Sequence, residues 1–225
     1  MILVTGGAKG LGAAMCTELA QRGHSLVIHY NQSQRAAEEL AEKWQAQTIH
    51  GDFSTPAGVE AFIENYRDRF PSTQGLVNNV GNYLIASASK TTDLAWRDLF
   101  QINFFTPQAL IQALLPSLKS VVNIGTAGLH STKAESYATA YMATKAALWF
   151  LTRSLAKELA PEGVTVNMVS PGILETSIDI EKVSKVPMKR AASLKEAARL
   201  VGFLFEKESH YITGQNIEVA GGFKL

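Results

Sequence analysis

Short apolar segments alternate with longer helix-forming segments over the first third of the chain. The apolar runs at residues 2–4, 25–30, 47–50 and 75–78 have the length of buried strands, and polar or glycine-rich clusters follow each of them. Parallel strands that are joined through helices form one sheet with right-handed crossovers and helices on both faces. The alternation therefore predicts an α/β fold with a doubly wound parallel sheet, whose ligands bind beyond the carboxyl ends of the strands.

The rest of the chain continues this pattern. Further strands are expected at residues 120–124, 164–169 and 217–219, which makes about seven in all. Helices are expected at residues 13–21, 34–45, 56–70, 92–115, 141–160 and 193–205, the fourth of them kinked by Pro107. With no repeat or linker, residues 1–225 are predicted to form a single domain, in which the irregular segment 173–186 is a short substrate lid.

A glycine-rich turn joins the first strand to the first helix. Its sequence, Thr5-Gly6-Gly7-Ala8-Lys9-Gly10-Leu11-Gly12, has the spacing Gly-x-x-x-Gly-x-Gly, which differs from the commoner Gly-x-Gly-x-x-Gly fingerprint. Glycines allow tight backbone turns and close approach of a ligand, and the N–H groups at the start of the helix attract a phosphate. Since any tight strand-to-helix turn also recruits glycine, the turn alone leaves the ligand open.

Tyr141 and Lys145 form a candidate acid–base pair. Residues four apart share one face of a helix, so the Lys145 ammonium can act on the Tyr141 hydroxyl. A nearby positive charge favours the phenolate and draws the tyrosine pKa toward the neutral range. An ordinary exposed Tyr and Lys on a surface helix is the alternative that the spacing leaves open.

The composition excludes several classes of function. A net charge of +1, with both signs well mixed, argues against a nucleic-acid-binding protein and a polybasic membrane-binding one. No apolar run approaches the length of a membrane span, no export signal is evident, and the one cysteine, Cys16, cannot form an internal disulfide, so a cytoplasmic location is expected. The five histidines lack metal-ligand spacing, and no metal site is expected.

These segments together resemble the short-chain dehydrogenase/reductase family from end to end. The glycine turn resembles its cofactor loop, and residues 78–81 (NNVG) resemble its Asn-Asn-Ala-Gly motif. Asn103, Thr126, Tyr141 and Lys145 occur in the order of its catalytic set, and residues 171–176 (PGILET) and 211–215 (YITGQ) resemble later signatures. Within the family, the chain is most similar to 3-oxoacyl-[acyl-carrier-protein] reductases.

The resemblance implies a Rossmann fold and an NAD(P)-dependent enzyme that reduces a small-molecule carbonyl compound to an alcohol. Tyr141 would donate a proton to the carbonyl oxygen, Lys145 would lower the Tyr141 pKa and hold the nicotinamide ribose, Thr126 would orient the carbonyl, and Asn103 would support a water chain. It also implies a homotetramer, with the Asn103 and Tyr141 helices and the last strand at the interfaces. The implied cofactor-binding residues are Gly6, Gly7, Ala8, Lys9, Gly10, Leu11, Gly12, Asn31, Asp52, Phe53, Asn79, Val80, Gly81, Tyr141, Lys145, Pro171, Gly172, Leu174 and Thr176.

The second strand predicts NADP(H) over NAD(H) as the cofactor. NAD-dependent relatives place an Asp or Glu at its end, whereas this strand ends His-Tyr-Asn-Gln-Ser and has no acid before Glu38. Lys9 stands where NADP-dependent relatives hold a basic residue, and Asn31 or Ser33 could add hydrogen bonds to a 2′-phosphate. A Lys9 side chain that simply points into water is the alternative.

Three departures from the family pattern bear on the substrate. Thr126 replaces the usual serine, the loop from Gly128 to Tyr137 is longer, and the segment after Pro171 is shorter. Ser131 is a second hydroxyl in that loop, and we expect Thr126 to be the functional one because it directly follows a strand. Pteridine or small-ketone reduction, a nucleotide-sugar epimerase or dehydratase, and a catalytically silent dinucleotide-binding protein remain as alternatives.

Overall fold

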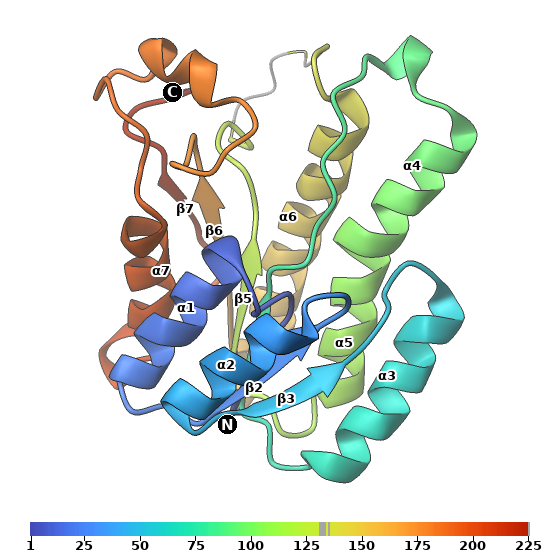
Figure 1. Ribbon diagram of the computed structural model, residues 1–225, viewed down its shortest axis with the longest axis vertical. Helices are drawn as coiled ribbons and strands as arrows, with labels where there is room; N and C mark the ends of the chain where they lie inside the picture. Colours follow the sequence, from blue (N-terminus) through green and yellow to red (C-terminus); the bar gives the residue numbers. More distant parts are fainter. Residues whose placement is uncertain (131–133, 135, 225) are drawn as a thin grey trace.

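The computed structural model describes residues 1–130, 134 and 136–224. Within those residues, seven parallel strands form one sheet in the spatial order β3-β2-β1-β4-β5-β6-β7 (Figure 1). The strands are β1 Ile2–Val4, β2 Leu26–Tyr30, β3 Gln47–His50, β4 Gly75–Asn78, β5 Ser120–Ile124, β6 Thr165–Pro171 and β7 Asn216–Val219. The predicted doubly wound parallel sheet is confirmed. Its strand order reverses between β1 and β4, which opens a crevice at their carboxyl ends.

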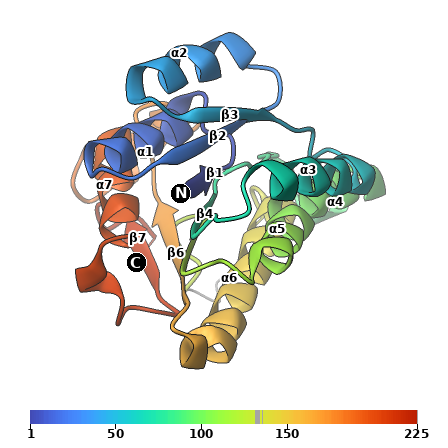
Figure 2. The same cartoon turned by 90° about the horizontal axis from the view of Figure 1, so that it is seen from below.

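Two layers of helices cover the sheet, as Figure 2 shows from below. One layer holds α1 Gly10–Gln21, α2 Gln34–Trp44 and α7 Leu194–Phe203, and the other holds α3 Pro56–Arg69, α4 Asp93–Phe100, α5 Thr106–Leu114 and α6 Thr139–Leu159. Short helical turns connect them, namely η1 Ala88–Lys90, η2 Gln101–Phe105, η3 Ala160–Glu162, η4 Ile180–Lys185 and η5 Lys207–Ser209. Because both faces are covered, the central strands are buried on both sides.

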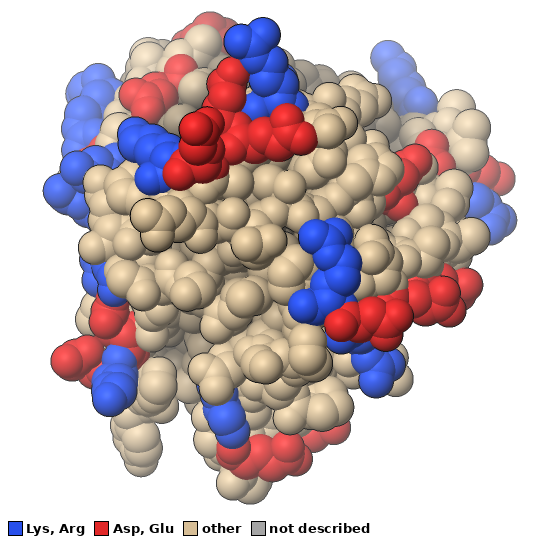
Figure 3. Space-filling model, turned by 60° about the horizontal axis from the view of Figure 1, so that its bottom comes forward, with Lys and Arg blue, Asp and Glu red and all other residues tan. Residues whose placement is uncertain are grey.

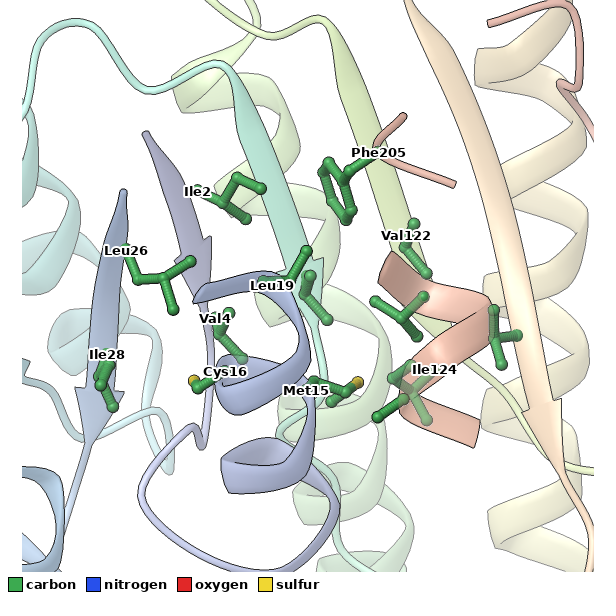
Figure 4. Close-up of a cluster of buried hydrophobic side chains, with 14 of the residues drawn as sticks. Ile2, Val4, Met15, Cys16, Leu19, Leu26, Ile28, Val122, Ile124 and Phe205 are labelled. Carbon is green, nitrogen blue, oxygen red and sulfur yellow. The ribbon is translucent and has the colours of Figure 1, made fainter. Parts of the chain in front are cut away.

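Apolar side chains fill the space between the sheet and α1. Val4 and Ile28 project from neighbouring strands toward Met15 and Leu19 of α1, and all four are fully buried (Figure 4). Burying each such side chain stabilises the fold by about 1.5–3 kcal/mol. A second cluster packs the opposite face against α3, α5 and α6. The two clusters hold the sheet rigid, and the strand ends are thereby fixed in relative position.

The long helix predicted at residues 92–115 is instead two α-helices joined by a π-helical turn, η2. Pro107 lacks an N–H group, and the Thr106 hydroxyl donates to the carbonyl oxygen of Gln101 at 2.9 Å, so the irregularity lies in the turn before the proline. Asn103 sits in this turn and is completely buried. The turn therefore directs a polar side chain into the molecule.

Two further observations concern the whole chain. On the face shown in Figure 3, acidic and basic side chains lie next to one another in small groups. No helix in the described part of the chain is long and apolar enough to cross a membrane.

Candidate functional site

A cavity of about 800 Å³ opens at the carboxyl ends of the central strands. Residues of four segments line it: Leu11 lies in the first turn of α1, Thr126 follows β5, Tyr141 lies in the first turn of α6, and Pro171 ends β6. Residues of the predicted lid, 173–186, line it as well, including Leu174, Thr176 and Asp179. The cavity thus brings two of the predicted catalytic residues, Thr126 and Tyr141, together with part of the predicted cofactor site.

The Tyr141 hydroxyl is hydrogen-bonded to the side chain of Thr126 at the cavity wall. Burial raises the pKa of Tyr141 to about 12, although the Thr126 hydrogen bond acts in the opposite direction. The phenol is therefore protonated at neutral pH. A protonated hydroxyl beside a second hydroxyl can donate a hydrogen bond to one carbonyl oxygen placed between them.

Lys145 lies one helical turn below Tyr141 and is almost completely buried. Its Nζ donates to the carbonyl oxygen of Ile124 at 2.7 Å and lies 5.9 Å from the centroid of the Tyr141 ring. Burial lowers the pKa of Lys145 to about 8, so its charge is costly at this position. A buried ammonium with one protein acceptor retains donors for a further ligand.

The Tyr141 pKa is raised in this structure, so burial outweighs the lowering that was expected from Lys145. Burial disfavours the charged form of both groups, and it moves their pKa values in opposite directions, the tyrosine up and the lysine down. The four-residue spacing correctly placed the two side chains near each other. It carried no information about their desolvation.

Asn103 connects three segments of the site. Its Oδ1 accepts from the backbone N–H of Asn82 at 2.8 Å, and its Nδ2 donates to the Asn82 carbonyl oxygen at 2.9 Å and to the Thr144 hydroxyl at 3.0 Å. A Cβ atom built on Gly81 would lie 3.3 Å from this Oδ1 and 3.5 Å from the Nζ of Lys145. The loop after β4 therefore passes between the side chains of Asn103 and Lys145. A larger residue at position 81 would crowd both side chains.

A chain of buried amides and hydroxyls holds α6 against the sheet. Asn78 of β4 donates to the Oδ1 of Asn123 in β5 at 2.8 Å, and Asn123 donates to the Thr152 hydroxyl of α6 at 2.9 Å. Hydrogen bonds in a dry interior are directional and costly to lose. They fix the position of the helix that carries Tyr141 and Lys145.

The glycine loop, residues 6–12, bends sharply from β1 into α1. Gly6 and Gly10 adopt left-handed conformations, with φ of +60° and +53°. A Cβ atom on Gly12 would collide with the carbonyl oxygen of Gly6. The glycines at these three positions are therefore required by the turn itself.

The start of α1 fits a bound phosphate. The helix begins at Gly10 instead of Ala13, which places the last three residues of the loop in its first turn. Its N-cap residue is Lys9, whose side chain makes no capping hydrogen bond, and the first turn carries no acidic side chain. The first N–H groups of a helix lack partners inside it and attract anions, so this end suits the pyrophosphate of a dinucleotide.

Thr5 and Asn79 anchor the loop from β4. The Thr5 hydroxyl accepts from the backbone N–H groups of Asn79 and Val80, at 2.9 and 3.1 Å, while the Nδ2 of Asn79 donates to the carbonyl oxygens of Thr5 and Gly6, at 3.0 and 3.2 Å. Asn79 and Val80 thus hold the glycine loop beside the loop after β4.

His29 is a part of the site that the sequence analysis missed. It is buried in β2, where its Nδ1 accepts from the backbone N–H of Gly6 at 3.0 Å and its Nε2 lies 3.1 Å from the carbonyl oxygen of Gly51. Since Nδ1 is an acceptor, the neutral ring carries its proton on Nε2 and donates to Gly51. The available signal was a polar residue in an otherwise apolar strand, because a buried polar side chain requires partners.

Three of the predicted cofactor-binding residues follow β2 and β3. Asn31 and Asp52 are exposed and their side chains are 3.4 Å apart, and the Asp52 carboxylate also accepts from the backbone N–H of Ser54 at 2.9 Å. Phe53 is buried and its ring stacks on His29, with centroids 4.2 Å apart. Of these three residues, only Asn31 and Asp52 present side chains to a ligand.

The remaining predicted residues follow β6. Pro171 ends the strand, and a Cβ atom on Gly172 would lie 2.9 Å from the Cα of Ala220.

Gly7 and Ala8 are buried within the glycine loop, whereas Lys9 is exposed at its tip. Ser131, the alternative hydroxyl to Thr126, lies outside the described residues. Among the described side chains, no group of three or more His, Cys, Asp and Glu comes together as a metal site.

Comparisons with known proteins agree with this geometry. Residues 6–224 match the family model described as enoyl-(acyl carrier protein) reductase. The chain is 31% identical to a 3-oxoacyl-[acyl-carrier-protein] reductase of Salmonella typhimurium, over 99% of this chain and 96% of that protein.

Two solved structures are similar over nearly their whole length. One is a blue fluorescent protein from a metagenomic library in complex with NADPH, with a TM-score of 0.92 and 29% identity over 100% of this chain and 97% of the other. The second is an acetoin dehydrogenase from Enterobacter cloacae, with a TM-score of 0.91 and 30% identity over 99% and 95%. The chain therefore belongs to the short-chain dehydrogenase/reductase family of NAD(P)-dependent oxidoreductases.

Proposed function

We propose that this protein is an NADP(H)-dependent reductase that converts a carbonyl compound to an alcohol, with Tyr141 as the proton donor. The observation that carries the proposal is the protonated Tyr141 hydroxyl, bonded to Thr126 in a cavity that the glycine loop also lines. A phenol with a pKa of about 12 keeps its proton at neutral pH, so Tyr141 holds a proton that it can give to the product oxygen.

The side chains divide the work of carbonyl reduction. A nicotinamide dinucleotide, when bound, supplies hydride transfer to the carbonyl carbon. Tyr141 and Thr126 donate hydrogen bonds to the carbonyl oxygen, and Tyr141 gives its proton as negative charge develops there. Lys145 would hold the nicotinamide ribose through its hydroxyls, and its positive charge would stabilise a transient phenolate.

Asn103 would support the return of a proton to Tyr141. It binds the backbone of Asn82 beside the Nζ of Lys145, with the Gly81 position between the two side chains. The absence of a side chain at Gly81 leaves space for water near both groups. We propose that such water connects Lys145 to solvent.

The central test is Tyr141→Phe. This variant loses only the hydroxyl, so carbonyl reduction should fall about 10²- to 10⁴-fold while the affinity for NADPH, measured by fluorescence titration, stays the same. Tyr211→Phe is the matched control, since the Tyr211 side chain is fully exposed outside the cavity. Near wild-type turnover by Tyr141→Phe would refute the assignment.

The cofactor preference is tested at Lys9. Lys9 is exposed at the start of α1, and the end of β2 presents Asn31 instead of an acid, which favours a 2′-phosphate. A charge-assisted contact to that phosphate should raise the preference for NADPH roughly 5- to 150-fold. Specificity constants for NADPH and NADH should converge in Lys9→Ala and stay apart in Lys43→Ala, which changes an exposed lysine of α2. Equal efficiency with NADH in the wild type would overturn the preference.

A 3-oxoacyl thioester is the proposed substrate class, with the segment 173–186 as its lid. The support is the similarity to 3-oxoacyl-[acyl-carrier-protein] reductases and a cavity lined by both apolar lid residues and Tyr141. The name of the acetoin dehydrogenase relative favours a small ketone as the second candidate. Nicotinamide absorbance measures the rates with acetoacetyl thioesters, diketones and dihydropteridines, and the preferred substrate identifies the class of reductase. A catalytically silent dinucleotide-binding protein would reduce none of them.

We further propose that the chain assembles into a homotetramer in the cytoplasm. Leu94, Phe105 and Phe150 are large, exposed and apolar, and they belong to the adjoining helical segments α4, η2 and α6. Apolar side chains gathered on neighbouring helices favour association. Cys16 is free and buried, which suits a reducing compartment.

A further inference from the structure

A carboxylate of the lid is held by three donors at the wall of the cavity. The Tyr83 hydroxyl donates to Oδ2 of Asp179 at 3.0 Å, and the Tyr137 hydroxyl donates to Oδ1 at 2.9 Å. The Nζ of Lys182 lies 3.5 Å from the same Oδ1 and 3.1 Å from the centroid of the Tyr137 ring. All four residues line the cavity that contains Tyr141 and Thr126.

The three donors form an anion-binding site, and the anion in it is the Asp179 carboxylate of the chain itself. Two phenol hydroxyls and an ammonium can all donate hydrogen bonds, and together they would bind any carboxylate of suitable size. Burial alone would raise the pKa of Asp179, but the hydrogen bonds from Tyr137 and Tyr83 and the charge of Lys182 hold it below its usual range. Asp179 therefore fills the site as an anion.

The cluster lies directly beside the proposed proton donor. The Tyr83 ring packs edge-on against the Tyr141 ring, with centroids 4.7 Å apart and planes at 89°. A substrate whose keto oxygen contacts Tyr141 would place its neighbouring atoms near Tyr83. A carboxylate on those atoms would meet the negative charge of Asp179 and find the donors already taken.

We propose that Asp179 is a specificity-determining residue, because its carboxylate occupies the donors that would otherwise bind an anionic substrate and so restricts the site to carbonyl compounds that are uncharged beside the keto group. This inference rests on the proposed carbonyl reduction and narrows its substrate class. Esters and thioesters of oxo acids belong to the admitted class, and the free oxo acids belong to the excluded one.

The first experiment compares matched substrates. Acetoacetate and levulinate are each assayed beside their methyl esters with NADPH, on the wild type, Asp179→Ala, Asp179→Asn and Glu181→Gln. Glu181→Gln is the control, since it removes a carboxylate from the same lid segment at a residue that does not line the cavity.

We expect the wild type to prefer the esters by roughly tenfold or more in kcat/KM, the discrimination that one charge-assisted hydrogen bond supplies. In Asp179→Ala the ratio of acid to ester should rise by a similar factor, chiefly through a lower KM for the acid. The ratio in Asp179→Asn should lie between those of the wild type and Asp179→Ala, because the amide fills the same position without the negative charge. Glu181→Gln should keep the wild-type ratio. A wild type that reduces acid and ester equally, or a ratio that does not change in Asp179→Ala, overturns the inference.

A second experiment tests the cluster without any turnover. Trypsin cleaves after Lys182 and Lys185, which lie in η4 of the lid. Loss of the Asp179 contacts should speed this cleavage in Asp179→Ala while the melting temperature stays close to that of the wild type. Acetate should restore protection to the variant by occupying the three donors, whereas sodium chloride at equal ionic strength should not.

The two experiments separate the possible failures. If no carbonyl compound is reduced but acetate protects the lid of Asp179→Ala, the proposed function fails and the anion site stands. If the esters are reduced and acetate has no effect, the proposed function stands and the assignment of Asp179 is wrong.

Discussion

His29 shows how one side chain can organise a binding loop without reaching a ligand. It joins the N–H of Gly6 to the carbonyl oxygen of Gly51, and its ring packs against Phe53 and Phe62, whose centroids are 4.2 and 5.3 Å away. The hydrogen bond from Gly6 requires the neutral ring, since a protonated Nδ1 could not accept it. Burial lowers the pKa of His29 to about 4, which maintains that form.

The His29 pKa predicts how stability depends on pH. Its pKa falls from 6.5 to about 4 on folding, so the unfolded chain binds the proton more readily. The contribution to the free energy of unfolding is fully present above pH 6.5 and is lost as the pH falls toward 4, by about 3 kcal/mol in total. Urea unfolding across this range measures it as the difference between the wild type and His29→Asn.

His210→Ala provides the control, since His210 is an exposed histidine that does not act on the pKa of His29. It should keep the pH slope of the wild type between pH 6.5 and 4. A difference between wild type and His29→Asn that does not vary with pH would contradict the neutral, hydrogen-bonded assignment.

At the scale of single elements, the start of α7 carries a complete capping box. The Ser193 hydroxyl accepts from the backbone N–H of Glu196 at 3.2 Å, and the Glu196 carboxylate accepts from the backbone N–H of Ser193 at 2.9 Å. Arg190 donates twice to the same carboxylate, at 2.8 and 2.7 Å, and these contacts lower the pKa of Glu196 to about 2. Glu175 accepts from the next backbone N–H, that of Leu194, so the cap also fastens the start of the proposed lid, residues 173–186.

Ser193→Ala should lower the free energy of unfolding by about 1 kcal/mol, because it removes one side of the capping box. Thermal or urea unfolding measures the change. Ser154→Ala is the control, since Ser154 is exposed in the middle of α6 and alanine is the better helix former there. If the two substitutions changed the free energy of unfolding equally, the capping hydrogen bond of Ser193 would contribute nothing to stability.

At the scale of the whole molecule, the exposed apolar residues of α4 and α6 predict assembly. Light scattering of the wild type should give four times the mass of the chain. Leu94→Asp combined with Phe150→Asp places charges on side chains that are 67% and 73% exposed, and it should reduce the mass without unfolding the chain. A monomeric wild type would refute the tetramer.

Local sequence patterns predicted the order of strands and helices along the chain, but they did not predict the irregular turn at η2. Apolar runs identified the central strands because these are buried on both faces, as in β1 and β5. Hydrophobic periodicity gave one continuous helix for residues 92–115, since a π-helical turn inserts a residue without changing the composition. That turn is what brings Asn103 to Asn82 and Thr144.

The sequence alone determined the order of strands and helices, the glycine loop and the order of Asn103, Thr126, Tyr141 and Lys145. These depend on spacing, which a linear pattern records. Only the tertiary structure decided the protonation of the site, because desolvation of Tyr141 and Lys145 depends on everything that packs around them. It also decided the contacts of Asp179, which joins tyrosines 96 and 42 residues away, since such distant partners meet only when the folded sheet brings their loops to one edge.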